Sequence, residues 1–267
     1  MFRSLMPRLS TALAPLLALA LVLGCGSKRV SLGGELKYGK TAEENYQFAE
    51  EELKDGNDVE AVKFFEFVRT KYPFSKYAAL SELRLADMKY DAGRWIEAAD
   101  AYREFLKLHP THENADRAAV RVGLAHWNDA PGEFFLFPPA HEKDQGSVRD
   151  AARELREFLD RFPDSKYRPE AEKVLAKARS RLAEHEWYVA EYYAKRDLWA
   201  GAAGRLETLV RDYPGTPHEQ DALMRLAEAY VKLDERFRAQ QALQQLIVKH
   251  PGSPRRAEAE KLLAQLR

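Results

Sequence analysis

The sequence predicts an all-α protein: a solenoid of five antiparallel helix pairs, closed by a C-terminal capping helix. Three observations predict it. An aromatic residue or a histidine followed by proline recurs along the chain, with the prolines at positions 73, 110, 163, 214 and 251. Small residues recur at fixed distances before these prolines, and large apolar residues follow each small pair. Self-similarity with a period of about 20 to 50 residues is typical of repeat architectures.

The small residues predict where paired helices cross. In four repeats two alanines lie twelve positions apart, and the second lies twelve before the proline: Ala49/Ala61, Ala86/Ala98, Ala190/Ala202 and Ala227/Ala239. The fifth pair, Gly123 and Ala151, is 28 apart. A small residue on each helix lets the two backbones approach closely, and the proline ends the second helix. The large residues then fill the space between pairs: Phe65, Val68, Tyr102, Phe105, Leu155, Phe158, Leu206, Leu209, Leu243 and Leu246.

The first 27 residues predict export and lipidation. Arg3 and Arg8 precede an uncharged run that ends in Leu23-Gly24-Cys25, and Cys25 is the only cysteine of the chain. A charged start, an apolar run and a small residue before the cut describe a secretory signal. The end of the run resembles a bacterial lipobox, which implies a signal peptide over 1–24 and a lipid on Cys25. A transmembrane helix is the alternative, but Pro15 interrupts the run.

Residues 25–40 are predicted to be a flexible tether, and 41–267 the solenoid. The repeat pattern, from about Thr41 to Pro251, resembles five tetratricopeptide repeats; an unrelated bundle with alanine-rich seams is the alternative. Thr41 with Glu44, Thr216 with Glu219, and Ser253 with Pro254 predict helix starts. The stretch from Pro254 to Leu266 is predicted to cover the end of the stack.

Two repeats depart from the period. The third contains an insertion at about 129–146 with the apolar run Phe134-Phe135-Leu136-Phe137-Pro138-Pro139. Either the insertion folds back onto the solenoid, or it is a loop that binds a partner. In the fourth repeat the first helix is about 14 residues longer than usual, close to four helical turns. This helix, predicted over about 169–195, would connect the first three repeats to the last two.

Composition and motifs argue against several classes of function. Without the two arginines of the signal peptide, Lys plus Arg is 40 and Asp plus Glu is 42, so the mature net charge is −2, which does not suit a strongly basic nucleic-acid binder. One cysteine allows no disulfide framework and no cysteine-rich metal site. The sequence has no phosphate-binding glycine loop, nucleophile elbow or HExxH motif. We therefore expect no enzyme activity, no metal and no cofactor.

A helical solenoid instead offers a groove for peptides or other domains. Aromatic and arginine side chains usually dominate such contacts. One group of candidates lies in the first repeats, at Tyr46, Phe74, Tyr77 and Tyr90. The other runs from Trp187 to Trp199 and includes Arg196, with Arg205 following it. For each aromatic residue the alternative is a position in the core.

Four segments resemble the BamD family, the lipoproteins of the outer-membrane β-barrel assembly machinery. They are Tyr72-Pro73-Phe74-Ser75-Lys76-Tyr77, Leu108-His109-Pro110-Thr111-His112, and Val189-Ala190-Glu191-Tyr192-Tyr193 together with Arg211-Asp212-Tyr213-Pro214. The resemblance runs from about Ala42 to Leu233. The order of lipobox, five repeats, insertion and long helix also fits.

The resemblance implies a non-enzymatic scaffold, lipid-anchored on the periplasmic face of the outer membrane. Its expected partners are the POTRA domain of BamA nearest the barrel, other lipoproteins of the complex, and unfolded outer-membrane proteins. By position, Arg196, Arg205 and Tyr192 lie on the stretch expected to face BamA. Phe74 and Tyr77, with Tyr46, lie at the expected substrate groove.

Two other functions remain open at this stage. One is a periplasmic repeat lipoprotein that coordinates envelope constriction, related to the Tol–Pal system; a coiled coil before the repeats would favour it, and none is visible. The other is an adaptor for peptidoglycan hydrolases, which binding to such an enzyme would favour.

Overall fold

The computed structural model describes residues 36–132, 136 and 138–266, and in these it is entirely helical. The predicted signal peptide and Cys25 lie outside the described residues. The elements are α1 (Ala42–Asp55), α2 (Asp58–Lys71), α3 (Lys76–Asp91), α4 (Trp95–Leu108), α5 (Ala115–Asp129), the short 3-10 helix η1 (Ala140–Glu142), α6 (Gly146–Arg161), α7 (Arg168–Ala194), α8 (Trp199–Asp212), α9 (Glu219–Lys232), α10 (Arg236–Lys249) and α11 (Arg256–Gln265).

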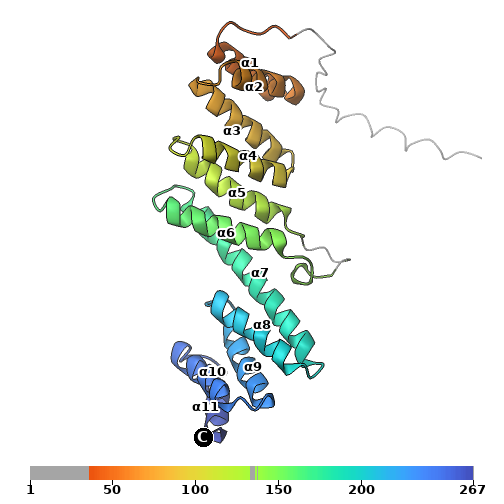
Figure 1. The fold of residues 1–267 in the computed structure, drawn as a ribbon, viewed down its shortest axis with the longest axis vertical. Coiled ribbons are helices and arrows are strands. Elements are labelled where there is room, and N and C mark those ends of the chain that lie inside the picture. The colour runs from red at the N-terminus through yellow and green to blue at the C-terminus, as the bar shows by residue number, and fades with distance from the viewer. Residues whose placement is uncertain (1–35, 133–135, 137, 267) are drawn as a thin grey trace, which may run out of the picture.

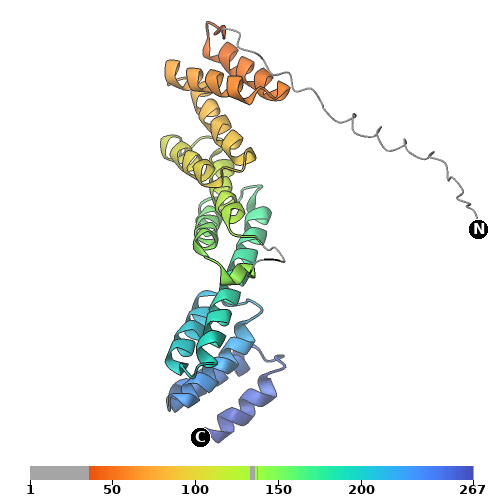
Figure 2. The ribbon, with the colours of Figure 1, turned by 90° about the vertical axis from the view of Figure 1, so that its right-hand side faces the viewer.

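The helices form five antiparallel pairs that stack in chain order along an elongated body, with α1 and α2 at one end and α11 at the other (Figures 1 and 2). The predicted all-α fold of five tetratricopeptide-type pairs and a capping helix is confirmed. Consecutive helices contact each other along the whole stack, so the core is a series of small clusters between pairs rather than one central mass.

The predicted helix crossings are confirmed by burial. All eight paired alanines are fully buried, as is Ala151. The ten large residues predicted to fill the space between pairs are also buried. Gly123 shows why a small residue is needed, because a Cβ at this position would lie 2.6 Å from Cγ of Leu155. An alanine here would push α5 and α6 apart.

The long helix α7 has 27 residues, which corresponds to about 40 Å. It runs obliquely between the first three pairs and the last two in Figure 1, as predicted. Its N-terminal half packs against α6, and its C-terminal half packs against α8. The two parts of the solenoid are therefore joined by one continuous rod.

The start of the folded body lies earlier than predicted. The segment from Leu36 to Lys40 packs against the first helix pair: the ring of Tyr38 stacks on Phe67 at 4.1 Å, and the hydroxyl of Tyr72 donates to the carbonyl of Lys40 at 3.0 Å. The buried side chain of Asn45 bonds both backbone groups of Gly39. Residues 36–40 of the tether predicted over 25–40 are therefore part of the folded body, and residues 25–35 lie outside the described part.

Of the predicted helix starts, only the first is confirmed. Thr41 and Glu44 form a reciprocal capping box at α1. The other two predictions are wrong. Thr216 donates its hydroxyl back to the carbonyl of Tyr213, and α9 begins three residues later, at Glu219. Ser253 accepts from the amide of Arg255, and α11 begins at Arg256.

Candidate protein-binding surfaces

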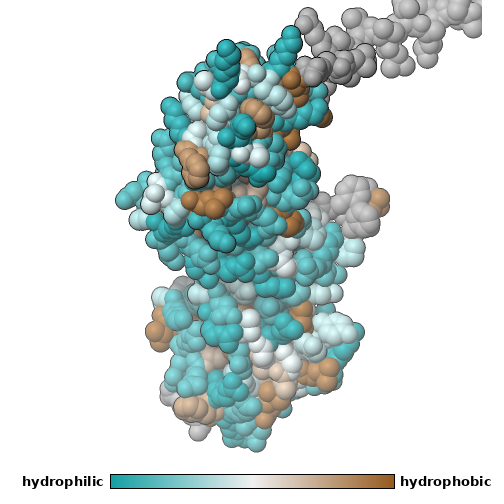
Figure 3. Space-filling model, turned by 45° about the horizontal axis from the view of Figure 1, so that its top comes forward, coloured by the Kyte–Doolittle hydropathy of each residue, from teal (hydrophilic) through white to brown (hydrophobic). Residues whose placement is uncertain are grey.

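On the face shown in Figure 3, hydrophobic residues lie in small separate groups on a mostly hydrophilic surface. No helix in the described ranges is both long and apolar enough to cross a membrane. Candidate binding sites therefore have to be built from individual exposed side chains. We describe two, and call them the N-terminal aromatic surface (Tyr46, Phe74 and Tyr77) and the α7–α8 surface (Tyr192, Arg196 and Arg205).

In the N-terminal aromatic surface, α1 and α3 bring two tyrosines together. The rings of Tyr46 and Tyr77 lie 5.4 Å apart, and Tyr46 also packs edge-on against the buried Phe65. Burial and a hydrogen bond to Glu50 raise the pKa of Tyr46 to about 12. Both tyrosines are thus partly buried by contacts within the protein, in line with the alternative interpretation that places them in the core.

Phe74 differs from these tyrosines. It lies in the turn before α3 and its side chain is fully exposed, at 102%. A phenylalanine in this position contributes nothing to the core, and leaving so much apolar surface in water is unfavourable. Of the three residues, Phe74 is the one most available to a partner.

A polar network connects the first three repeats. The guanidinium of Arg84 in α3 makes a two-pronged ion pair with Glu50 in α1, at 2.6 and 2.7 Å. The nearly buried Asp87 accepts both from the hydroxyl of Tyr102 and from Arg117 in α5, each at 2.6 Å. Burial and the Asp87 charge raise the pKa of Tyr102. This network fixes α1, α3, α4 and α5 relative to one another.

The same kind of pair recurs between later repeats. An acidic residue on the first helix of one repeat pairs with an arginine 34 positions later in Glu50–Arg84, Glu191–Arg225 and Asp221–Arg255. The sequence analysis missed these residues. The signal was present, because 34 residues is close to the repeat period, and a search for acid–arginine pairs at that offset would have found them.

On the α7–α8 surface, Tyr192 and Arg196 form one unit. The guanidinium of Arg196 lies 3.5 Å from the centre of the Tyr192 ring, and its Nη1 donates to the Tyr192 carbonyl at 3.0 Å. Tyr192 is 46% exposed, and Arg196 is exposed. An arginine over an aromatic face is held by cation–π attraction and keeps donors free. Within the described ranges no carboxylate pairs with Arg196.

Arg205 lies apart from this unit. It extends from α8 to the carboxylate of Glu186 on α7, with Nη1 to Oε2 at 3.2 Å. Glu186 is almost completely buried, and a buried carboxylate without a partner would be costly. The structure therefore gives Arg205 an internal role that the sequence analysis did not anticipate.

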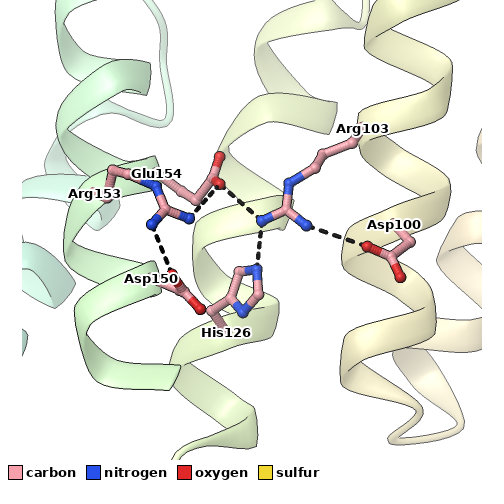
Figure 4. Close-up of polar contacts among 6 residues, drawn as sticks. All are labelled: Asp100, Arg103, His126, Asp150, Arg153 and Glu154. Carbon is pink, nitrogen blue, oxygen red and sulfur yellow. Dashed lines mark hydrogen bonds and ion pairs between the residues drawn. The ribbon is translucent and has the colours of Figure 1, made fainter. Parts of the chain in front are cut away.

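A further polar cluster joins α4, α5 and α6 (Figure 4). Nη2 of Arg103 donates to Glu154 and to Nε2 of His126, each at 2.7 Å. Because arginine has no acceptor, Nε2 must be unprotonated, so the proton of the neutral ring is on Nδ1, which is buried without a partner. Burial and the Arg103 charge lower the pKa of His126. Asp100, Asp150 and Arg153 complete the cluster.

Within the part of the chain that the structure describes, no three potential ligands are grouped so that they could bind a metal ion. His109 and His250, at the turns before proline, each lie beside a glutamate on the first helix of the same repeat, Glu82 of α3 and Glu219 of α9. The described side chains can bind another protein by ring contacts and ion pairs.

Comparison with known proteins identifies the family of the chain. The family described as "Outer membrane lipoprotein" (YfiO) matches residues 39–246. "Outer membrane protein assembly factor BamD" of Neisseria meningitidis serogroup A is 31% identical over 78% of each chain. The protein of the same name from Vibrio cholerae is 28% identical over 79% of this chain and 86% of its own.

Among solved structures, the "TPR2AB-domain:pHSP90-complex of yeast Sti1" aligns over 84% of each chain, with 15% identity and a TM-score of 0.40. The assignment to a family rests on the sequence matches, which extend from the segment before α1 into α10. This chain belongs to the BamD family of outer membrane lipoproteins.

Proposed function

We propose that this chain is a non-catalytic scaffold of the outer-membrane β-barrel assembly machinery, on the periplasmic face of the outer membrane. The observation that carries the proposal is the family match over almost the whole folded body, to relatives named as outer membrane protein assembly factors. The two candidate surfaces described above support it, because a scaffold must bind at least two partner proteins at once.

The first partner is BamA, through the POTRA domain nearest its barrel. The Tyr192–Arg196 unit supports this role, since aromatic and arginine side chains are enriched at the centres of protein interfaces. Arg196 has donors left for a carboxylate of the partner. Arg205 contributes indirectly, by neutralising Glu186 and so holding α7 against α8.

The second kind of partner is an unfolded outer-membrane protein, bound at the N-terminal aromatic surface. Phe74 would provide the apolar contact, and the Tyr46–Tyr77 pair would form the wall beside it. The polar network of Glu50, Arg84 and Asp87 keeps these helices in place without a contribution from the ligand. A preformed site loses less conformational entropy on binding.

Attachment to the membrane is proposed through a lipid on Cys25, with no other cofactor. Residues 26–35 would then connect the lipid to the packed segment at Leu36. A flexible chain of ten residues spans on the order of 16 to 19 Å r.m.s., so with such a tether the first repeat would stay close to the bilayer. Other lipoproteins of the complex are expected to join the same assembly.

The test is a detergent-extracted pull-down of the tagged full-length chain. We expect co-purification of a POTRA-containing barrel protein, strongly reduced by Arg196→Glu and retained by the neighbouring control Lys195→Glu. A Cys25→Ser variant should move from the membrane to the soluble fraction. Recovery of division or peptidoglycan enzymes without any POTRA-containing protein would contradict the proposal.

A further inference from the structure

The insertion between α5 and α6 is bound to α7 by buried polar contacts. Gln145 is only 1% exposed, and its amide donates to the carbonyls of Ala140 and Lys143, each at 2.7 Å. Its Oε1 accepts from Nε of Arg181 at 3.0 Å, and Nη2 of Arg181 donates to the Ala140 carbonyl at 3.0 Å. We call Gln145 and Arg181 the insertion latch. Residues 140–145 of the insertion therefore fold back onto the solenoid, in agreement with one of the two alternatives from the sequence.

The latch places η1 beside Tyr188 of α7. Nδ1 of His185 donates to the carbonyl of His141 at 2.7 Å, and the His141 ring lies 5.5 Å from the ring of Tyr188. His141 also contacts Glu184 at 3.2 Å. The carboxylate of Glu142 lies close enough to Tyr188 to raise the pKa of its hydroxyl. The insertion thus brings an acidic residue to the edge of this face of α7.

Arg181, His185, Tyr188, Tyr192 and Arg196 follow one another at intervals of three or four positions, so they share one face of α7 and its C-terminal end. The insertion contacts the first three of these residues. The last two are exposed. Tyr188 lies beside Glu142, and Arg196 lies just beyond the C-terminal end of α7 with its guanidinium over the Tyr192 ring. It is thus acidic at one end, basic at the other and aromatic between them.

We propose that the insertion supplies the acidic half of the surface on which the POTRA domain docks, so that Glu142 faces a basic side chain of that domain while Arg196 faces an acidic one. The inference rests on the proposed function of the α7–α8 surface and extends it to a second element. Two opposite charges at separate points of one surface fix the orientation of a partner as well as its position. The two exposed tyrosines provide the apolar centre of the interface.

The experiment is a titration of the full-length chain, in detergent, with a soluble POTRA fragment of the barrel protein from the same organism. We expect Glu142→Lys to raise Kd about tenfold, mainly through slower association and a changed dependence on salt. The matched control is Glu104→Lys on α4, an exposed glutamate far along the chain from this face. This control should bind like the wild type.

A second variant, Gln145→Ala, tests the latch without changing any charge. Hydrogen exchange at residues 140–145 should become faster, and Kd should rise several-fold although Tyr192 and Arg196 are intact. If both variants bind like the wild type while Arg196→Glu binds weakly, the insertion is not part of the interface and only the proposed function stands. If the wild-type chain does not bind the fragment, the proposed function fails, and this inference fails with it.

Discussion

The two candidate surfaces contain similar residue types but differ in what they leave free. At the N-terminal aromatic surface, Tyr46 is half-buried beside Glu50, whereas Phe74 is exposed and presents only an apolar ring. At the α7–α8 surface, Tyr192 supports Arg196, whose charge has no carboxylate partner among the described residues. The first surface suits an apolar segment of an unfolded chain. The second suits a folded partner that presents a carboxylate.

The surfaces also differ in what supports them. In the N-terminal repeats, Asp87 of α3 is nearly buried and accepts from Tyr102 of α4 and Arg117 of α5. A similar triad in the C-terminal repeats joins Glu207 to Tyr230 and Arg238, but the side chain of Glu207 is 37% exposed. Water can replace the lost contacts in the second case and not in the first. The N-terminal repeats should therefore be the more rigid region, and the more sensitive to loss of one charge.

The largest effect is expected from Asp87→Ala. It leaves the buried hydroxyl of Tyr102 and the guanidinium of Arg117 without their acceptor, so the free energy of unfolding should fall by about 3 kcal/mol. The matched variant Glu207→Ala should cost about 1 kcal/mol or less. Urea titration followed by circular dichroism measures both. Equal losses would contradict the difference in rigidity between the two regions.

Arg196→Glu should have the next largest effect, and only on the partner of the α7–α8 surface. It replaces the guanidinium with a carboxylate, which would repel the carboxylate expected on the partner. The Kd for the POTRA fragment should therefore rise about 30-fold, which corresponds to about 2 kcal/mol. Arg205→Ala should instead lower stability, because the buried Glu186 loses its partner. Calorimetric titration and thermal melts separate the two arginines. A weaker complex at unchanged stability for Arg205→Ala would show that Arg205 contacts the partner directly.

A smaller effect is expected at the other surface. Phe74→Ala should weaken binding of a peptide from the C-terminus of an outer-membrane protein about fivefold, or about 1 kcal/mol. Stability should change by less than about 0.5 kcal/mol, because the ring is fully exposed. Leu108→Ala, at another exposed apolar residue, is the control for nonspecific binding. Fluorescence anisotropy of a labelled peptide measures this, and equal losses for both variants would rule out a defined site at Phe74.

The smallest effect is a dependence of stability on pH at the α4–α6 cluster. The folded-state pKa of His126 lies below its unfolded value of about 6.5. The unfolded chain therefore binds more protons as the pH falls through that value, and the free energy of unfolding decreases toward acid pH. His126→Gln, which can still accept from Arg103, should flatten this part of the profile. Denaturant midpoints between pH 7.5 and 5 test it; identical profiles would show that His126 does not contribute.

Much of the scaffold could be predicted from the sequence because its determinants are local and periodic. The paired alanines and Gly123 report helix crossings at a fixed spacing, and all of these alanines are buried. The long helix was predicted over about 169–195 and is observed at Arg168–Ala194. Packing of this kind depends on the size of a side chain at a repeated position, which a sequence shows directly.

Features that depend on tertiary contacts were predicted less well. Thr216 has the sequence of a helix cap, yet its hydroxyl bonds a carbonyl in the preceding turn, while Glu219 accepts from the amide of Gly215. The same residue types favour both arrangements. Two further features likewise depend on which elements become neighbours. They are the pairing of Arg205 with Glu186 and the packing of the segment 36–40 against the first helix pair. The assignment of a partner to each of the two surfaces came from the family resemblance, not from the spacing of residues.

The central claim is that two separate surfaces bind two different partners. The most direct test measures both ligands on one sample, with a labelled outer-membrane-protein peptide and the POTRA fragment added together to the full-length chain. The account predicts a ternary complex for the wild type, loss of the fragment alone in Arg196→Glu, and weakening of the peptide alone in Phe74→Ala. Competition between the two ligands for the wild-type chain, or loss of both in either variant, would contradict it.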